Sequence, residues 1–421
     1  MSRGYVPGDS APVAEAAGPR EGVPAVIVDR RSLQAYAESI AQGTGPMAVD
    51  AERASGYRYS QRAYLIQVRR AGAGTALIDP TRLDDLDPLQ QAGSEAEWVL
   101  HAATQDLPCL AEVGLRPTRL FDTELAGRLL GRERVSLAAL VDSELGQHLV
   151  KGHGAADWSA RPLSPELLHY AALDVEWLIE LRDVLHGHLE TAGKLSWAQE
   201  EFAALVHFVP RERREEPWRR TSGLHRIRKP RALAVVRSLW QARDDLARRI
   251  DIAPGRVLPD ASIIAAAEAM PASAEALGAL KPFMGRGQQR RLATWWSAIG
   301  RAMALADADL PAASPPAFGP PPPRAWADKD PAAWARLQSA RDALAAVSEQ
   351  LSIPVENLIS PETVRLACWE PPGGGSPDAL HDALLQAGAR PWQIAIAVPI
   401  LAAAIEGAQD EPGQDVIVTG Q

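Results

Sequence analysis

Asp50 and Glu52 are the first side chains in this sequence whose types and spacing suit metal chemistry. They follow the apolar run 46–49 (Pro-Met-Ala-Val), which predicts a short buried strand. Alternate side chains of a strand share a face, so we expect the two carboxylates to point the same way. Taken alone, an Asp-x-Glu after an apolar run is also typical of a strand end that enters a solvated loop.

A second pair, Tyr170 and Asp174, lies far downstream. Residues 164–166 (Ser-Pro-Glu) predict the start of a helix, with serine as the N-cap and proline in the first turn. On that helix the two side chains are one turn apart and share a face. Carboxylates gathered from separate elements repel each other, and a divalent cation that prefers hard oxygen ligands, Mg²⁺ or Mn²⁺, removes that repulsion. The alternative is an ordinary half-buried tyrosine beside a surface carboxylate.

Asp106 adds a third acidic position. Residues 98–101 (Trp-Val-Leu-His) predict a strand, and residues 102–107 lead from it into a helix, where the helix dipole alone would also favour an acid. With Asp50, Glu52, Tyr170 and Asp174, the set resembles the tyrosine-bearing subclass of the DEDD exonuclease superfamily. Residues 157–164 and 170–175 resemble the ribonuclease D family in particular, and the resemblance runs from about residue 25 to about residue 190. The joint occurrence of all five residues in family order favours the metal site.

The resemblance implies a hydrolytic 3′-5′ exoribonuclease. Asp50, Glu52 and Asp174 would hold two Mg²⁺ or Mn²⁺ ions, with Asp106 assisting, at the attacking and leaving oxygens of the 3′-terminal phosphodiester. Tyr170 would orient the attacking water or help to deprotonate it. The implied products are nucleoside 5′-monophosphates, and the implied partners are RNA 3′ ends of tRNA precursors or other structured RNA. Ala51 stands where the family usually carries threonine, at a position that is not a metal ligand.

Two other classes of function remain open. One is a DNA-directed 3′-5′ exonuclease, which would use the same ligand set, and the other is a non-catalytic nucleic-acid-binding protein. A helicase is excluded, because the sequence has no Gly-x-x-x-x-Gly-Lys-[Ser/Thr] phosphate loop. We expect no nucleotide cofactor, and the sequence does not indicate the oligomeric state.

The composition is acidic for a nucleic-acid-binding protein. The 421 residues carry a net charge of −9. Binding of RNA must therefore come from a local basic surface. The two cysteines, Cys109 and Cys368, form no metal-binding pair, and such sparse cysteine usage is typical of the reducing cytoplasm. We expect a cytoplasmic protein without a membrane span, because no run of about 18 apolar residues occurs.

The strongest local positive charge lies between residues 211 and 231, where nine basic residues face three glutamates and surround Trp218. Arginine clusters with an aromatic platform often bind RNA, so Arg219, Arg220 and Arg228 are candidate RNA-binding residues. A plain solvated linker explains the same run. Arg161 and Lys151 are candidates for contacts with substrate phosphate, and the alternative for each is a pairing with a surface acid.

The alternation of elements predicts the fold. Short apolar runs at 25–28, 47–49, 63–68 and 75–78, with a hairpin turn at 69–74, precede alternating helices and strands. This order predicts a mixed sheet, and the resemblance implies a ribonuclease H-like α/β exonuclease domain. Two all-α bundles should follow, because residues 242–246 match 340–344 at an offset of 98 and residues 252–258 match 352–358 at an offset of 100. Both copies resemble the HRDC domain.

These observations predict seven segments in chain order. They are a disordered tail (1–22), the exonuclease domain (23–208), a basic linker (209–231), a first HRDC domain (232–308), a Pro-rich linker (309–328), a second HRDC-like domain (329–408) and a second tail (409–421).

Overall fold

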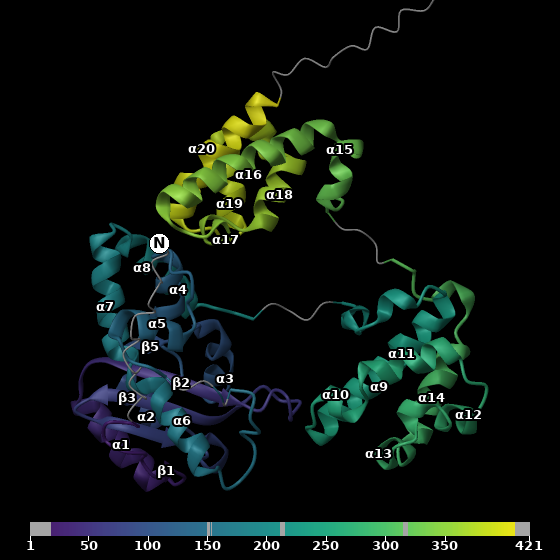
Figure 1. Ribbon diagram of the computed structural model, residues 1–421, viewed down its shortest axis with the longest axis horizontal. Helices are drawn as coiled ribbons and strands as arrows, with labels where there is room; N and C mark the ends of the chain where they lie inside the picture. Colours follow the sequence, from purple (N-terminus) through teal and green to yellow (C-terminus); the bar gives the residue numbers. More distant parts are fainter. Residues whose placement is uncertain (1–17, 150–151, 153, 211–214, 315–318, 409–421) are drawn as a thin grey trace, which may run out of the picture.

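The computed structural model describes residues 18–149, 152, 154–210, 215–314 and 319–408, which form an α/β domain and two helical bundles (Figure 1). The predicted tails, apart from residues 18–22, lie outside the described residues, as does Lys151. No helix within these ranges is both long enough and apolar enough to cross a bilayer.

The α/β domain is built on one mixed sheet with the strand order β1-β4-β3-β2-β5-β6. Strands β2, β3 and β4 pair antiparallel, whereas β1 with β4, β2 with β5 and β5 with β6 pair parallel. The predicted mixed sheet and the predicted hairpin are therefore confirmed. The strands are β1 (Val26–Ile27), β2 (Thr44–Arg53), β3 (Ala63–Ala71), β4 (Gly74–Ile78), β5 (Glu97–Leu100) and β6 (Arg119–Asp122).

Strand β2 separates two layers of helices. Met47 and Val49 pack with residues of α1 and α2 on one face of the sheet, and Ala48 packs with Val175 of α6 on the other. Because side chains alternate along a strand, Asp50 and Glu52 share the face of Ala48, which is the face that α6 covers. The helices of this domain are α1 (Arg30–Gln42), α2 (Asp87–Gly93), α3 (Leu107–Glu112), α4 (Thr123–Leu129), α5 (Leu137–Leu145), α6 (Pro165–Glu176), α7 (Leu178–Thr191) and α8 (Leu195–Val206).

Helix α6 begins as its sequence predicts. Ser164 is the N-cap, its hydroxyl accepts a hydrogen bond from the Leu167 backbone N–H at 3.4 Å, and Pro165 occupies the first turn. The N-cap and the proline set the starting point of the helix. The starting point in turn fixes which residues face the sheet, and Tyr170 and Asp174 are among them.

The two bundles repeat one arrangement of helices. The first contains α9 (Pro230–Ile250), α10 (Pro254–Val257), α11 (Asp260–Ala269), α12 (Ala274–Gly278), α13 (Arg286–Gln289) and α14 (Leu292–Met303). The second contains α15 (Trp326–Lys329), α16 (Pro331–Leu351), α17 (Val355–Leu358), α18 (Pro361–Trp369), α19 (Pro377–Gln386) and α20 (Pro391–Gly407).

The register of the repeat differs from the offsets that the sequence suggested. Helices α16, α17 and α18 each start 101 residues after α9, α10 and α11. Helices α9 and α16 also end alike, at Asp251 and Ser352, which both adopt left-handed backbone conformations with φ of 48° and 50°. One constant offset therefore relates the two copies. The short identities that gave 98 and 100 lie out of structural register.

Both predicted linkers are shorter than expected, because two tryptophans anchor them. Trp218, in the basic segment, is 4% exposed and belongs to the core of the first bundle. Trp326 is completely buried in the core of the second bundle, and its indole N–H donates to the Pro321 carbonyl at 2.7 Å. The segments around these residues belong to the bundles. Residues 211–214 and 315–318 lie outside the described residues.

Candidate active site

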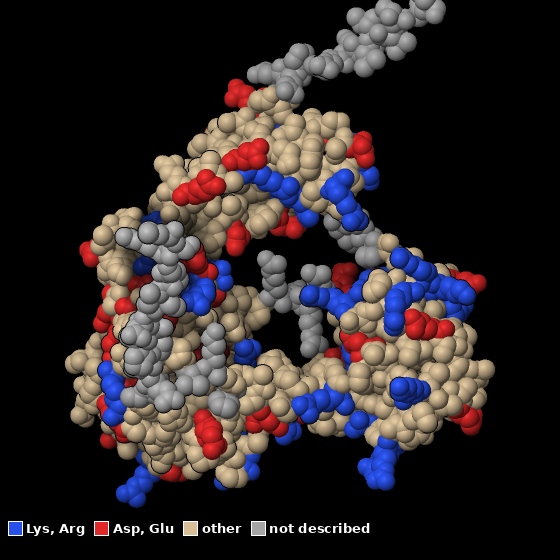
Figure 2. Space-filling model, viewed as in Figure 1, with Lys and Arg blue, Asp and Glu red and all other residues tan. Residues whose placement is uncertain are grey.

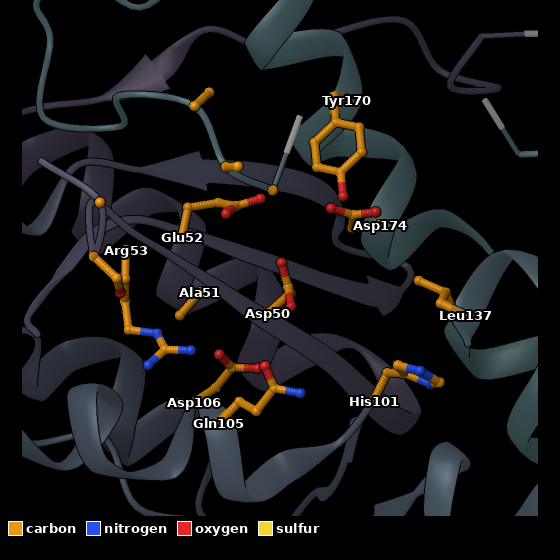
Figure 3. Close-up of a pocket in the computed structure, with 15 residues that line it drawn as sticks. Asp50, Ala51, Glu52, Arg53, His101, Gln105, Asp106, Leu137, Tyr170 and Asp174 are labelled. Carbon is orange, nitrogen blue, oxygen red and sulfur yellow. The ribbon is translucent and has the colours of Figure 1, made fainter. Parts of the chain in front are cut away.

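The five side chains singled out for metal chemistry line one pocket of about 440 Å³ (Figure 3). Strand β2 supplies Asp50 and Glu52, the turn before α3 supplies Asp106, and α6 supplies Tyr170 and Asp174. Residues separated by more than a hundred positions in the chain thus meet, as the family resemblance implied. The joint occurrence of these residues was a better guide than any of them taken alone.

Three of the carboxylates are close enough to share an ion. Asp50, Glu52 and Asp174 each offer an oxygen, and these three oxygens lie within 4.8 Å of one another. Asp106 is 5% exposed, and in Figure 3 it lies on the side of Asp50 that faces away from Glu52 and Asp174. Carboxylate oxygens at this density are the donor set that Mg²⁺ or Mn²⁺ takes. The residues present therefore fit a divalent cation.

The electrostatics of the pocket show how strongly its carboxylates interact. Burial raises the pKa of Asp50 to about 6. Burial, and then the charges of Asp50, Asp174 and Asp106, raise the pKa of Glu52 to about 10. Burial, followed by the charge of Asp50, also raises the pKa values of Asp106 and Asp174 well above their usual range. Such mutual elevation marks a site that needs a cation to hold all of its carboxylates ionised.

Tyr170 is part of the same network. Its hydroxyl is hydrogen-bonded to Asp174 and points toward the carboxylates in Figure 3. Burial, and then the negative charge of Asp174, raise the pKa of the phenol above its ordinary value. The phenol is therefore protonated at neutral pH and donates a hydrogen bond into the pocket.

Asp106 is held by a turn that the sequence did not reveal. Ala102 has a left-handed backbone with φ of 57°, which is unusual for a residue other than glycine. The buried Asp122 carboxylate accepts hydrogen bonds from the Ala102 and Ala103 N–H groups at 3.1 and 2.8 Å and so fixes this turn. Asp106 occupies the N-cap position of α3, but its side chain makes no capping hydrogen bond. Its carboxylate is therefore available to the pocket, which argues against the capping alternative.

Arg53 is a site residue that sequence reasoning missed. It lines the pocket, and its positive charge lowers the pKa values of Asp50, Glu52 and Asp106. Regular alternation would put Arg53 on the opposite face from Glu52. A shift in the pairing of β2 with β3 between Glu52 and Arg53 turns the side chain toward the pocket instead.

Sequence reasoning also missed two polar side chains in or next to the site, Gln67 and His101. Gln67 on β3 pairs directly with Asp50 in the sheet register, is completely buried, and has no hydrogen-bond partner among the described residues. A lone amide inside the apolar run 63–68 was the available signal. His101 lines the pocket, and its Nδ1 lies 2.9 Å from the Thr123 hydroxyl. Burial lowers the pKa of His101 to about 4, so its ring is neutral at pH 7.

Arg161 is placed differently from the prediction of a phosphate contact. It is not among the residues that line the pocket. Its guanidinium donates to the buried Asp79 carboxylate at 2.7 Å and to the carbonyls of Trp158, Ala160 and Tyr64 at 2.7 to 2.8 Å. These contacts give Arg161 a structural role, which corrects the prediction. The other candidate, Lys151, lies outside the described residues.

The basic segment also differs in part from the prediction. Trp218 is buried in the first bundle and cannot serve as an aromatic platform for RNA. The Arg219 guanidinium is held by Glu216 at 2.6 Å and lies 4.3 Å from the centre of the Trp218 ring. Arg220 and Arg228 are exposed, and no described residue pairs with either. In Figure 2, Lys and Arg side chains gather on the visible face of the first bundle.

Three family descriptions match consecutive parts of the chain. A 3′-5′ exonuclease family matches residues 25–190, and the HRDC domain matches residues 232–299. Residues 319–405 match a family described as the 3′ to 5′ exonuclease C-terminal domain. The first bundle is thus an HRDC domain, and the second matches a family of its own, although both share one arrangement of helices.

Individual proteins resemble the chain over longer stretches. Ribonuclease D of Granulibacter bethesdensis is 36% identical, over 59% of this chain and 64% of that protein. Ribonuclease D of Acidiphilium cryptum is 34% identical, over 61% of this chain and 68% of that protein. The chain thus matches about two thirds of the length of these relatives.

Two crystal structures match the chain across all three of its parts. A protein from Bifidobacterium adolescentis is 38% identical with a TM-score of 0.86, over 93% of this chain and 99% of that one. Escherichia coli RNase D, described as an exoribonuclease involved in structured RNA processing, is 25% identical with a TM-score of 0.64, over 92% of this chain and 99% of that one.

Proposed function

The chain belongs to the ribonuclease D family, and we propose that it is a 3′-5′ exoribonuclease that removes nucleotides hydrolytically with the help of divalent cations. The observation that carries this proposal is the convergence of Asp50, Glu52, Asp106 and Asp174 with Tyr170 in one pocket. A merely nucleic-acid-binding protein would have no use for four mutually repelling carboxylates in a pit. Their repulsion lowers the stability of the metal-free fold, and a bound cation offsets it.

Asp50, Glu52 and Asp174 would hold the ions, and Asp106 would complete the ligand set directly or through water. When bound, two Mg²⁺ or Mn²⁺ ions supply an activated water and stabilise the charge that develops on the scissile phosphate. Tyr170 donates its O–H toward this region and orients the attacking water. In the metal-free pocket the phenol is protonated, so its hydroxyl acts as a hydrogen-bond donor that orients the water.

We assign to Arg53 the contact with substrate phosphate that the sequence predicted for Arg161. It is the sole Lys or Arg among the described pocket-lining residues, and it lies beside Asp106 in Figure 3. An arginine in this position contacts a phosphate oxygen of the substrate with its planar set of donors. Arg53→Ala should therefore lower kcat/KM by about 10- to 100-fold. Arg82→Ala, a change of equal charge at an exposed position of the same domain, should leave it unchanged.

RNA with a structured body, such as a tRNA precursor, is the substrate class we propose. The support is the likeness to the Escherichia coli enzyme, together with exposed arginines on the first bundle that lie outside the catalytic pocket. A DNA-directed exonuclease would use the same carboxylates. The pocket residues alone do not distinguish the two substrates.

The test compares RNA and DNA oligonucleotides of one sequence, each labelled at the 3′ end, with and without Mg²⁺. We expect Mg²⁺-dependent release of nucleoside 5′-monophosphates, one at a time, and faster release from RNA. Asp50→Asn should abolish this release in a protein that keeps its circular dichroism spectrum. Faster release from DNA would favour the DNA-directed alternative, and activity that persists in EDTA would refute the metal-dependent mechanism.

A further inference from the structure

The loop that follows the catalytic strand β2, residues 54–62, forms one wall of the pocket and is held from outside by the first bundle. Ser55 and Gly56 of this loop line the pocket next to Arg53. In Figure 1 the loop extends from the edge of the α/β domain to α10. The wall of the catalytic pocket thus lies between two domains.

The base of the loop is fixed within the α/β domain. Ala54 is completely buried in a cluster with Trp158 and Ala171, and its carbonyl accepts the N–H groups of Tyr57 and Arg58 at 2.8 and 2.7 Å. The Arg58 guanidinium donates to the Ser159 hydroxyl at 2.7 Å. These contacts hold the start of the loop, whereas Gly56 and residues 59–60 extend beyond them.

Two backbone carbonyls of the loop are held by the first bundle. The Ala253 N–H donates to the Tyr57 carbonyl at 2.9 Å, and Arg256 donates to the Gly56 carbonyl at 2.8 Å. The Arg256 guanidinium also lies 3.9 Å from the centre of the Tyr57 ring, within the range of a cation–π contact. One of the two loop residues that line the pocket, Gly56, is therefore hydrogen-bonded directly to α10.

The tip of the loop is bound to the end of α9. The Ser60 N–H donates to the Asp251 carboxylate at 2.8 Å. The Tyr59 hydroxyl lies 3.1 Å from both oxygens of the buried Asp244 carboxylate and 3.3 Å from the Arg248 guanidinium. Asp251 is the residue with the left-handed backbone that ends α9, and this turn aims its carboxylate at the loop.

We propose that the first bundle is a positioning element of the active site, which holds the loop 54–62, and with it Arg53, Ser55 and Gly56, in the geometry that the reaction needs. This inference rests on the proposed nuclease function and adds a catalytic role for a domain that would otherwise serve only to bind RNA. The contacts are to backbone groups as well as to side chains, so they fix the path of the loop itself. A displacement of about 1 Å at a reacting centre can reduce a rate by about 100-fold.

Two bundle variants separate positioning from RNA binding. Arg256→Ala removes the donor to Gly56 together with the stack on Tyr57. Asp251→Gly removes the acceptor for Ser60 but keeps the left-handed backbone, which glycine adopts freely. Asp251→Asn retains an oxygen acceptor and tolerates the same backbone conformation, so it is the conservative partner variant. Arg249→Ala, at an exposed position of α9, is the matched control.

The substrate of the test is a dinucleotide, which is too short to occupy the pocket and an arginine surface on the bundle together. We expect Arg256→Ala and Asp251→Gly each to lower kcat on the dinucleotide by about 10-fold or more with KM changed less than about twofold. Asp251→Asn should recover most of the loss, and Arg249→Ala should match the parent. Parental kcat in both loss variants would overturn the inference.

A second measurement does not depend on activity. Hydrogen exchange of the peptide that covers residues 54–62 should be faster in Arg256→Ala and Asp251→Gly than in the parent, while exchange in α6 stays unchanged. Equal exchange in the loop would overturn the inference even if activity fell. An inactive parent enzyme with accelerated loop exchange in the variants would instead count against the proposed function and leave the positioning role standing.

Discussion

Replacing Asp50 with asparagine should stabilise the metal-free protein. An oxygen of Asp50 lies within 4.8 Å of oxygens of Glu52 and Asp174. Two unit charges at this separation repel each other by about 3.5 kcal/mol at an effective dielectric constant of about 20. The pKa of Glu52 is raised to about 10, so Glu52 keeps its proton at neutral pH and adds little repulsion. The raised pKa of Asp174 favours its protonated form, which relieves part of the repulsion that remains between Asp50 and Asp174. We therefore expect Asp50→Asn to raise the free energy of unfolding in EDTA by about 1 to 2 kcal/mol.

In excess Mg²⁺ the order of stability should reverse. A cation that binds only the folded state adds about 3 kcal/mol when its free concentration is about 100 times its Kd. The parent gains this term, whereas the asparagine variant has lost the charge at the centre of the ligand set and gains little. The variant should thus be the more stable protein in EDTA and the less stable one in Mg²⁺, and its nuclease activity should fall by several orders of magnitude.

The same reasoning sets the sign of the pH dependence. A carboxyl whose pKa is raised on folding binds its proton more tightly in the folded state, so stability falls as the pH rises between the two pKa values. For Asp50 the folded value is about 6 and the ordinary value 3.8. The metal-free parent should lose stability across this interval, and Asp50→Asn should lack the contribution of Asp50 to that loss.

Urea unfolding followed by tryptophan fluorescence measures both effects. Glu190→Gln, which removes an exposed carboxylate of α7, is the control and should respond to neither EDTA nor Mg²⁺ differently from the parent. Equal stabilisation of Asp50→Asn and the parent by Mg²⁺ would refute the assignment of Asp50 as a ligand. A variant that is less stable than the parent in EDTA would refute the calculated repulsion.

Three further outcomes are expected. Tyr170→Phe should lower kcat by about 100-fold with RNA affinity nearly unchanged, because only the orienting hydroxyl is lost, whereas equal losses of binding and turnover would make the tyrosine structural. Arg161→Ala should lower the free energy of unfolding by about 3 kcal/mol, since it leaves the Asp79 carboxylate buried without its cation, and an unchanged urea midpoint would contradict this role. Neutralising Arg220 and Arg228 together should flatten the slope of log K against log salt by about 2, and an unchanged slope would show that they do not contact RNA.

The parts of the site that the sequence predicts are those set by local periodicity. Alternation along a strand puts Asp50 and Glu52 on one face, and the N-cap at Ser164 sets the phase of the helix that carries Tyr170 and Asp174. Each of these relations depends on residues a few positions apart. What brings the two elements together is the packing of α6 on β2, and here the family resemblance supplied what periodicity could not.

The residues that were misjudged depend on distant partners. Arg53 faces the pocket because β2 shifts its pairing with β3 at Ala63, and no property of residues 46–53 shows that shift. Arg161 is held by Asp79, a partner 82 positions earlier in the chain. Trp218 lies in a run of arginines that is typical of a solvated segment, yet it completes the core of a bundle whose other residues follow it. In each case, the contact that decides the role is not encoded within the surrounding segment.

The two copies of the helical unit meet the α/β domain through the same corner, the end of the long first helix and the short helix that follows it. In the second bundle this corner is apolar, since Ile353 and Leu358 belong to the core of the α/β domain. Lys194 reinforces it by donating to the Leu129 and Leu351 carbonyls at the ends of α4 and α16.

In the first bundle the equivalent corner is polar and holds the pocket loop through Asp251 and Arg256. A duplicated unit thus serves once to extend the core and once to shape the catalytic wall. An α/β domain without the two bundles would expose the apolar surface that contacts the second bundle. It would also lose the contacts that hold the loop 54–62 to the first bundle. If the positioning role that we propose holds, full activity requires the first bundle as well as the α/β domain.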